Sequence, residues 1–241
     1  MEGPASTDPI GNEDTMKTAA YFDKFAKEYE SQDRDRFLFY RWIIQSIIRQ
    51  VDRDDCDIVD IGAGTGNLAL RLAVKYPKSR ISGIDISEGM LREAEARRRK
   101  KGLTNIRFGL GSAENPTEGR ADFVVSALAF HHVKNKERAI SSIHNKLARN
   151  GKLIIGDWFE PDDRYEREVT KLRRHKPRLA KEFDRSWEAF KGMKGPYEEE
   201  HPKEFPISQA ELVRIMKEAG FKKQKILKSL IPAFAVVVGE K

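Results

Sequence analysis

The stretch VDIGAGTGN, residues 59–67, carries three glycines at alternating positions directly after an apolar run. Glycine tolerates left-handed backbone conformations and lets a ligand approach the main chain, so this density of glycine indicates a binding loop. The apolar run at 56–61 predicts a buried strand, and residues 67–75 predict a helix that begins at the loop. A strand, a glycine loop and a helix in this order predict a ligand near the free N–H groups of the helix.

Outside this loop, strand and helix patterns alternate along the chain. Further strands are predicted at residues 80–86, 106–111, 121–128 and 152–159. Helices are predicted after Ser87, a typical N-cap residue, and over residues 137–148, closed by Asn150 and Gly151. Strand and helix alternating throughout predicts an α/β fold, a doubly wound and mostly parallel sheet with helices on both faces.

The C-terminal part departs from this alternation. Ser208 and Glu211 form a capping box, which predicts a helix that ends at Gly220. Two apolar-rich runs follow at 225–230 and 233–238, and the link between them is too short for a crossover helix. They are therefore predicted to pair as an antiparallel hairpin.

A single domain is predicted over residues 17–241. Residues 1–16 are rich in Gly, Pro, Ser, Thr and acids and are expected to form a disordered tail. Residues 17–52 contain two amphipathic helices with aromatic stripes, which are predicted to act as an N-terminal lid. Residues 160–206 are predicted to be an inserted cap over the carboxyl edge of the sheet.

Composition narrows the class of protein. The single cysteine, Cys56, has no disulfide partner, and the histidines lie scattered without ligand spacing, so no metal is expected. The longest apolar stretch, 231–238, is far shorter than the roughly 20 residues that cross a bilayer, so a cytoplasmic protein is expected. A net charge of +7 leaves an anionic partner open.

Asp85 supports a nucleoside ligand. It ends the second predicted strand, where a carboxylate can accept hydrogen bonds from both ribose hydroxyls. A dinucleotide is one reading, but the loop has the spacing G-x-G-x-G instead of G-x-G-x-x-G, and Asn67 stands at the last position of that pattern. The other reading of Asp85 is a helix-capping carboxylate beside Ser87.

Four motifs in order resemble those of class I S-adenosylmethionine-dependent methyltransferases. They are VDIGAGTGN, GIDISEGML at 83–91, GLGSAENP at 109–116 and ADFVVSALAFHHV at 121–133. The form of the fourth is similar to that of small-molecule methyltransferases, including the quinone-biosynthesis branch. The resemblance implies a seven-stranded sheet of order 3-2-1-4-5-7-6 with its last strand antiparallel, S-adenosylmethionine as cofactor, and methyl transfer by in-line displacement.

The resemblance also implies which residues bind the cofactor. The methionine moiety is expected against Asp60 and the glycine loop, the ribose on Asp85, and the adenine beside Ile86. Ser112 stands where the family commonly has Asp; its hydroxyl can still accept a hydrogen bond from the adenine, and the Ala113 N–H remains available. The full expected set is Tyr21, Tyr29, Asp60, Gly62, Ala63, Gly64, Asn67, Asp85, Ile86, Ser112, Ala113 and Ser126.

Catalytic and substrate residues are less clearly marked. His131 and His132 follow the fourth strand at the ligand edge of the sheet and are candidate general bases, or else structural parts of the loop. Candidate acceptor contacts are Asp157, Trp158, Tyr165 and Tyr197.

The acceptor itself stays open. A small molecule, with anionic ones included, is the first hypothesis. An RNA or protein methyltransferase is the alternative, because residues 97–101 and 171–181 are basic. Against it, residues 160–206 as a whole carry as many acids as bases, and the cations at 97–101 end a helix. A non-catalytic cofactor-binding protein is a third hypothesis, disfavoured by the intact glycines and Asp85.

Overall fold

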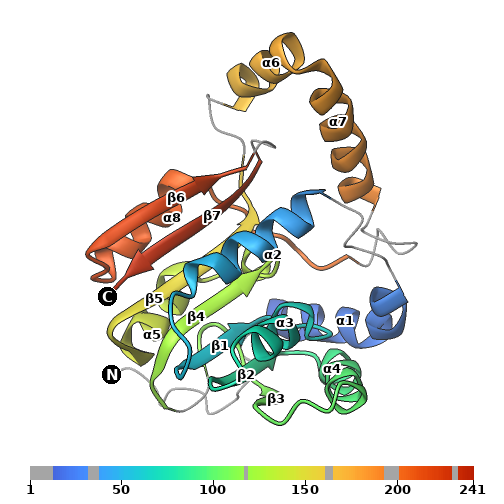
Figure 1. Ribbon diagram of the computed structural model, residues 1–241. Helices are drawn as coiled ribbons and strands as arrows, with labels where there is room; N and C mark the ends of the chain where they lie inside the picture. The colour runs from blue at the N-terminus through green and yellow to red at the C-terminus, as the bar shows by residue number, and fades with distance from the viewer. Residues whose placement is uncertain (1–12, 32–37, 117–118, 161–164, 193–200, 230–232) are drawn as a thin grey trace.

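The glycine loop lies at the centre of one mixed sheet. The computed structural model describes residues 13–31, 38–116, 119–160, 165–192, 201–229 and 233–241. Strand β1 (Asp57–Ile61) enters the loop and helix α3 (Asn67–Lys75) leaves it, as predicted. The seven strands run in the order β3-β2-β1-β4-β5-β7-β6, which confirms the expected topology (Figure 1).

Parallel pairing joins the first five strands, and the hairpin closes one end. The other strands are β2 (Arg80–Asp85), β3 (Ile106–Leu110), β4 (Ala121–Ala127), β5 (Leu147–Trp158), β6 (Lys223–Lys228) and β7 (Phe234–Glu240). Strand β7 runs antiparallel to both β5 and β6, so the predicted C-terminal hairpin is confirmed. Parallel strands bring the loops after β1, β2 and β4 to one edge.

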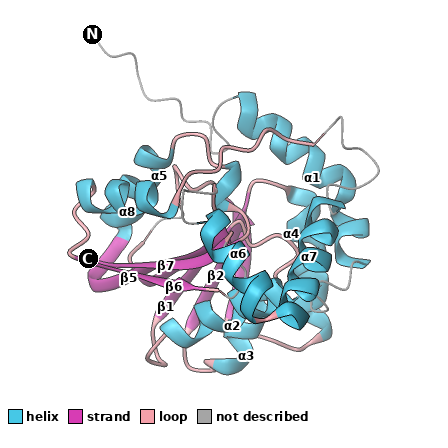
Figure 2. Ribbon diagram, turned by 90° about the horizontal axis from the view of Figure 1, so that it is seen from above, coloured by secondary structure: helices cyan, strands magenta, loops and turns pink. Residues whose placement is uncertain are grey.

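Helices cover both faces of the sheet (Figure 2). Besides α3, the described helices are α1 (Glu13–Ser31), α2 (Leu38–Gln50), α4 (Glu88–Lys100), α5 (Lys136–Lys146), α6 (Tyr165–His175), α7 (Pro177–Gly192) and α8 (Gln209–Glu218), with a 3₁₀ turn η2 (Phe130–His132). Helices α2 and α3 share one apolar core with the sheet, and α5 and α8 share the other. None of the helices in the described part is long and apolar enough to span a membrane.

The predicted helix starts at Ser87 and Ser208 are confirmed. The Ser87 hydroxyl accepts a hydrogen bond from the Met90 N–H at 3.0 Å, and the Ser208 hydroxyl accepts one from the Glu211 N–H at 3.1 Å. Each bond satisfies one of the free N–H groups in the first turn of a helix.

Two local expectations were wrong. Helix α5 ends at Lys146, since Leu147 is already extended and pairs with β4. Helix α1 begins at Glu13, so residues 13–16 are helical, and residues 1–12 lie outside the described part.

The two N-terminal helices differ in their surroundings. Helix α2 packs into the core, with Phe39, Ile43 and Ile47 almost fully buried, so it is a layer of the fold and not a lid. Helix α1 instead lies against α4 beside the glycine loop. Helices α6 and α7, from the inserted segment, project beyond the sheet above its ligand edge (Figure 1).

Candidate active site

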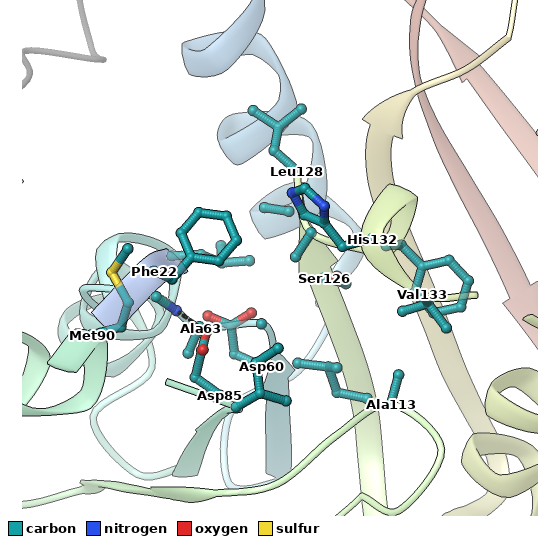
Figure 3. Close-up of a pocket in the computed structure, with 18 of the residues that line it drawn as sticks. Phe22, Asp60, Ala63, Asp85, Met90, Ala113, Ser126, Leu128, His132 and Val133 are labelled. Carbon is teal, nitrogen blue, oxygen red and sulfur yellow. Dashed lines mark hydrogen bonds between the residues drawn. The ribbon is translucent and has the colours of Figure 1, made fainter. Parts of the chain in front are cut away.

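A deep cavity opens at the carboxyl edge of β1, β2 and β4, under helix α1. The space between its walls, with the open mouth included, is about 1070 Å³. Most of the predicted cofactor residues line it, together with one predicted base: Tyr29, Asp60, Gly62, Ala63, Gly64, Asn67, Asp85, Ile86, Ser112, Ala113, Ser126 and His132 (Figure 3).

The glycine loop forms the floor of this cavity. Gly62, Gly64 and Gly66 have φ values of +69°, +54° and +81°, which side-chain-bearing residues rarely adopt. A Cβ on Gly62 would lie 2.3 Å from the Cβ of Ala129, whereas a Cβ on Gly64 would meet nothing within 4 Å. Gly62 therefore packs against the loop after β4, and Gly64 borders open space.

Asp85 is held rigidly at the end of β2. Its Oδ2 accepts a hydrogen bond from the Gly64 N–H at 2.7 Å, and its Oδ1 accepts one from the Ser87 N–H at 2.9 Å. Burial raises the pKa of this carboxyl above its usual value despite these bonds. Because each carboxylate oxygen has two lone pairs, each can still accept a hydrogen bond from a ligand hydroxyl.

Three buried polar atoms on the cavity wall have no hydrogen-bond partner within the described residues. They are Asp60 Oδ2, the Ser126 hydroxyl oxygen and His132 Nδ1. Buried polar groups are normally paired, so such atoms around one cavity indicate a polar ligand. Burial, and next the charge of Asp85, raises the pKa of Asp60 well above its usual range. Figure 3 shows Asp60 beside Asp85, with Ser126 and His132 across from them.

The charge of the cavity decides between the candidate ligands. Asp60, Asp85 and Glu114 line it, and no Lys or Arg is among its described lining residues, although the whole chain has a net charge of +7. A pyrophosphate would lie here against acids with no cation to pair with. A ligand with a sulfonium and an ammonium group would be stabilised by them, so the cavity fits S-adenosylmethionine better than a dinucleotide.

A family model described as a methyltransferase domain matches residues 52–220. The chain belongs to this methyltransferase family. A chain from Staphylococcus carnosus named as an uncharacterised methyltransferase is 30% identical over 165 residues, which span 65% of this chain and 75% of that one. A Rickettsia bellii ubiquinone/menaquinone biosynthesis C-methyltransferase is 28% identical over 221 residues, 87% of this chain and 86% of that one.

The architecture agrees with solved methyltransferases. A SAM-dependent methyltransferase from Aquifex aeolicus superposes with a TM-score of 0.62 at 18% identity, covering 90% of this chain and 97% of that chain. That neighbour is named for its use of S-adenosylmethionine, the ligand that the acidic cavity of this chain fits.

The two adjacent histidines have different surroundings in the methyltransferase. His131 is buried, and its Nδ1 lies 2.8 Å from Asp157 Oδ1, while its backbone N–H donates to Asp157 Oδ2 at 3.0 Å. His131 is not among the residues that line the cavity, but His132 is. Burial, and next the nearby His131 and His201, lowers the pKa of His132 well below its ordinary value, so its ring is neutral at neutral pH.

Of the four predicted acceptor contacts, the three that fall within the described residues are not among those that line the cavity. Asp157 is buried and also accepts a hydrogen bond from the Trp158 N–H at 2.8 Å, so its carboxylate is used within the fold. Trp158 and Tyr165 pack against the larger apolar core. Tyr197 lies outside the described residues.

Asp157→Ala is expected to lower the free energy of unfolding by about 3 kcal/mol, because a buried imidazole and two backbone N–H groups lose their acceptor. Urea unfolding followed by circular dichroism measures this loss. Lys171→Ala, which removes an exposed ion pair with Glu168, is the control and should leave stability unchanged within error. A loss for Asp157→Ala no larger than that of the control would contradict an anchoring role.

Tyr21 was predicted on the cavity, but Phe22 occupies that place. Successive helix residues are rotated by about 100°, so Tyr21 faces the outer side of α1, where its ring centroid lies 5.2 Å from that of His201. Phe22 and Tyr29, seven residues apart, share the inner face. The aromatic stripe in the sequence signalled this helix without showing which ring faces the ligand.

Sequence reasoning missed several other lining residues, among them Thr18, Tyr40, Met90 and Leu128. Tyr40 contacts the residue that follows the glycine loop, because its hydroxyl oxygen accepts a hydrogen bond from Asn67 Nδ2 at 2.7 Å. As for metals, no three His, Cys, Asp or Glu side chains of the described residues come together as a possible ligand set.

Proposed function

We propose that this enzyme transfers the methyl group of S-adenosylmethionine to a small-molecule acceptor held in the same cavity. The observation that carries the proposal is that His132, a neutral histidine with a buried Nδ1 that has no partner among the described residues, lines the cavity opposite Asp60 and Asp85. One cavity thus offers both a site for a cationic donor and a group that can take a proton from an acceptor.

The donor is placed by the residues on the β1 and β2 side. Asp85 receives the ribose hydroxyls on its remaining lone pairs, and the Gly62–Gly64 backbone with Asp60 lies along the methionine part. Ile86, Ser112 and Ala113 border the adenine. When bound, S-adenosylmethionine supplies a methyl group activated by its sulfonium. The chain contributes alignment, and proximity of this kind lowers a barrier by up to about 7–11 kcal/mol.

Helix α1 favours an acceptor of small size. Thr15, Thr18 and Phe22 of this helix line the cavity, so an acceptor must fit beneath α1 to reach the donor. The Rickettsia bellii relative is named for a carbon methylation in quinone biosynthesis, which agrees with a small organic acceptor.

The basic segment 97–101 gives little support to a nucleic-acid substrate. Arg97 donates to the carbonyl oxygen of Thr65, a residue of the glycine loop, at 2.9 Å, and Arg98 donates to Glu95 at 2.7 Å. These cations therefore serve the fold. The cations at 171–181 are exposed, but they lie on α6 and α7, which are not among the elements that line the cavity.

His132→Gln is expected to lower kcat by at least about a hundredfold if the acceptor loses a proton, because general-base catalysis contributes 10²–10⁴. Donor affinity should stay within about twofold of wild type, since the change lies on the acceptor side. Because burial lowers the pKa of His132, the wild-type rate should fall only at pH well below 6.5. A pH profile of kcat measures both effects, with Lys171→Ala as the control. Unchanged turnover at saturating acceptor would rule out His132 as the base.

Transfer of a labelled methyl group identifies the class of acceptor. The purified enzyme is incubated with labelled S-adenosylmethionine and, separately, with the low-molecular-mass, RNA and protein fractions of a cell extract. We expect label to enter the low-mass fraction, and to fail to do so with Asp85→Ala. Label that enters only the RNA or only the protein fraction would contradict the proposal.

A further inference from the structure

Asp23 on helix α1 caps the start of a different helix. Its Oδ1 accepts a hydrogen bond from the Ser87 hydroxyl at 2.7 Å and another from the Gly89 N–H at 2.6 Å. Ser87 and Gly89 are the N-cap and an early residue of α4. A carboxylate at a helix N-terminus satisfies free N–H groups and interacts favourably with the helix dipole. Asp23 therefore tethers α1 to α4.

The same hydrogen bonds lead to the donor site. Ser87 is fully buried, and while its hydroxyl donates to Asp23, its backbone N–H donates to Asp85 Oδ1. Asp85 in turn accepts from the Gly64 N–H of the glycine loop. A continuous set of bonds thus joins α1, the end of β2 and the glycine loop.

Gly89 allows α1 to approach this closely. A Cβ at position 89 would lie 3.0 Å from the Cα, the carbonyl oxygen and Oδ1 of Asp23. Two of these are backbone atoms, so an alanine here requires α1 and α4 to separate by a few tenths of an ångström. The neighbour of Asp23 on α1, Phe22, lines the donor cavity, as does Met90 on α4. A shift of α1 would therefore alter the cavity wall.

We propose that Asp23 is a positioning residue for the methyl donor. By holding Ser87 it fixes the carboxylate of Asp85, and by seating α1 on α4 it places Phe22 and Thr18 over the cavity. The inference rests on the proposed role of Asp85 at the ribose and is independent of the acceptor.

Titration calorimetry with S-adenosylhomocysteine tests the inference without any acceptor. Asp23→Ala is expected to weaken binding about tenfold, the loss that corresponds to a hydrogen bond to a charged group. Gly89→Ala should weaken it similarly, although alanine favours the helix. Asp23→Asn keeps an oxygen acceptor at Oδ1 and should restore most of the affinity. Lys17→Ala, an exposed change on the same helix, should leave it unchanged.

Thermal unfolding without ligand is measured for every variant, so that affinities are compared only between variants that are folded at the temperature of the calorimetry. Unchanged affinity in Asp23→Ala and Gly89→Ala, with or without a fall in stability, would overturn the inference and leave Asp23 a structural tether. An affinity of Asp23→Asn for S-adenosylhomocysteine as low as that of Asp23→Ala would also overturn the inference. Asp85→Ala separates the two proposals. If Asp85→Ala binds S-adenosylhomocysteine normally, the proposed donor site itself is refuted. If Asp85→Ala loses binding while Asp23→Ala binds normally, only the role of Asp23 is refuted.

Discussion

Asp85→Ala is expected to weaken the binding of S-adenosylhomocysteine by at least about a hundredfold, because two hydrogen bonds to a buried carboxylate, at roughly 1.5–3 kcal/mol each, are lost. The change also leaves the Gly64 and Ser87 N–H groups without their acceptor, which loosens the loop that faces the ligand. Both effects act on the same complex, so this substitution should be the most damaging single change of charge in the site.

Glu114→Gln is the matched control for Asp85→Ala. Glu114 also lines the cavity, but no contact with the donor is assigned to it, so its loss removes negative charge alone. Calorimetry should find affinity within about threefold of wild type for this variant, as expected for a half-buried charge that forms no hydrogen bond with the donor. If both variants bound equally weakly, a general negative potential and not the ribose contact would explain donor binding.

The glycine loop provides a second large effect that separates binding from stability. Gly64→Ala places a methyl group where no atom lies within 4 Å, in the wall of the donor cavity. Its positive φ of +54° should cost about 1–2 kcal/mol of stability. Donor affinity should fall about a hundredfold or more, because the methyl group occupies the space assigned to the methionine part. Calorimetry and urea unfolding measure the two quantities.

Gly62→Ala is the counterpart of Gly64→Ala, because its main expected effect is on the free energy of unfolding and not on donor affinity. Its methyl carbon would lie 2.3 Å from the Cβ of Ala129, and the φ of +69° adds strain. A loss of about 3 kcal/mol in the free energy of unfolding is expected from overpacking and strain together. Equal losses of stability in the two variants would contradict the division of the loop into a packed and a ligand-facing glycine.

The family resemblance allowed the order of the sheet to be predicted, and most of the residues it assigned to the donor line one cavity. Motifs such as VDIGAGTGN encode local geometry, because positive φ values and close backbone approach restrict certain positions to glycine. The position of Asp85 was predictable for a similar reason. Asp85 ends β2, which pairs in parallel with β1, so its side chain must lie at the same edge of the sheet as the glycine loop. For these residues, local backbone geometry and the order of the strands predict the same location at the edge of the sheet.

The surroundings of the residues proposed to contact the acceptor could not be predicted from the sequence residue by residue. His131 and His132 are adjacent in sequence, yet one bonds Asp157 inside the fold and the other lines the cavity. Tyr21 and Phe22 likewise differ only by the rotation of one helix position. Which ring faces a ligand depends on how α1 packs against α4, a long-range contact through Asp23 that leaves no periodic signal in the sequence.

The proposed donor site is best tested by a structure of the enzyme with S-adenosylhomocysteine bound. We expect both ribose hydroxyls within hydrogen-bonding distance of the Asp85 carboxylate, the homocysteine part along Gly62 to Gly64, and the sulfur facing the side of the cavity that holds His132. A ligand whose ribose lies away from Asp85, or which binds outside this cavity, would contradict it.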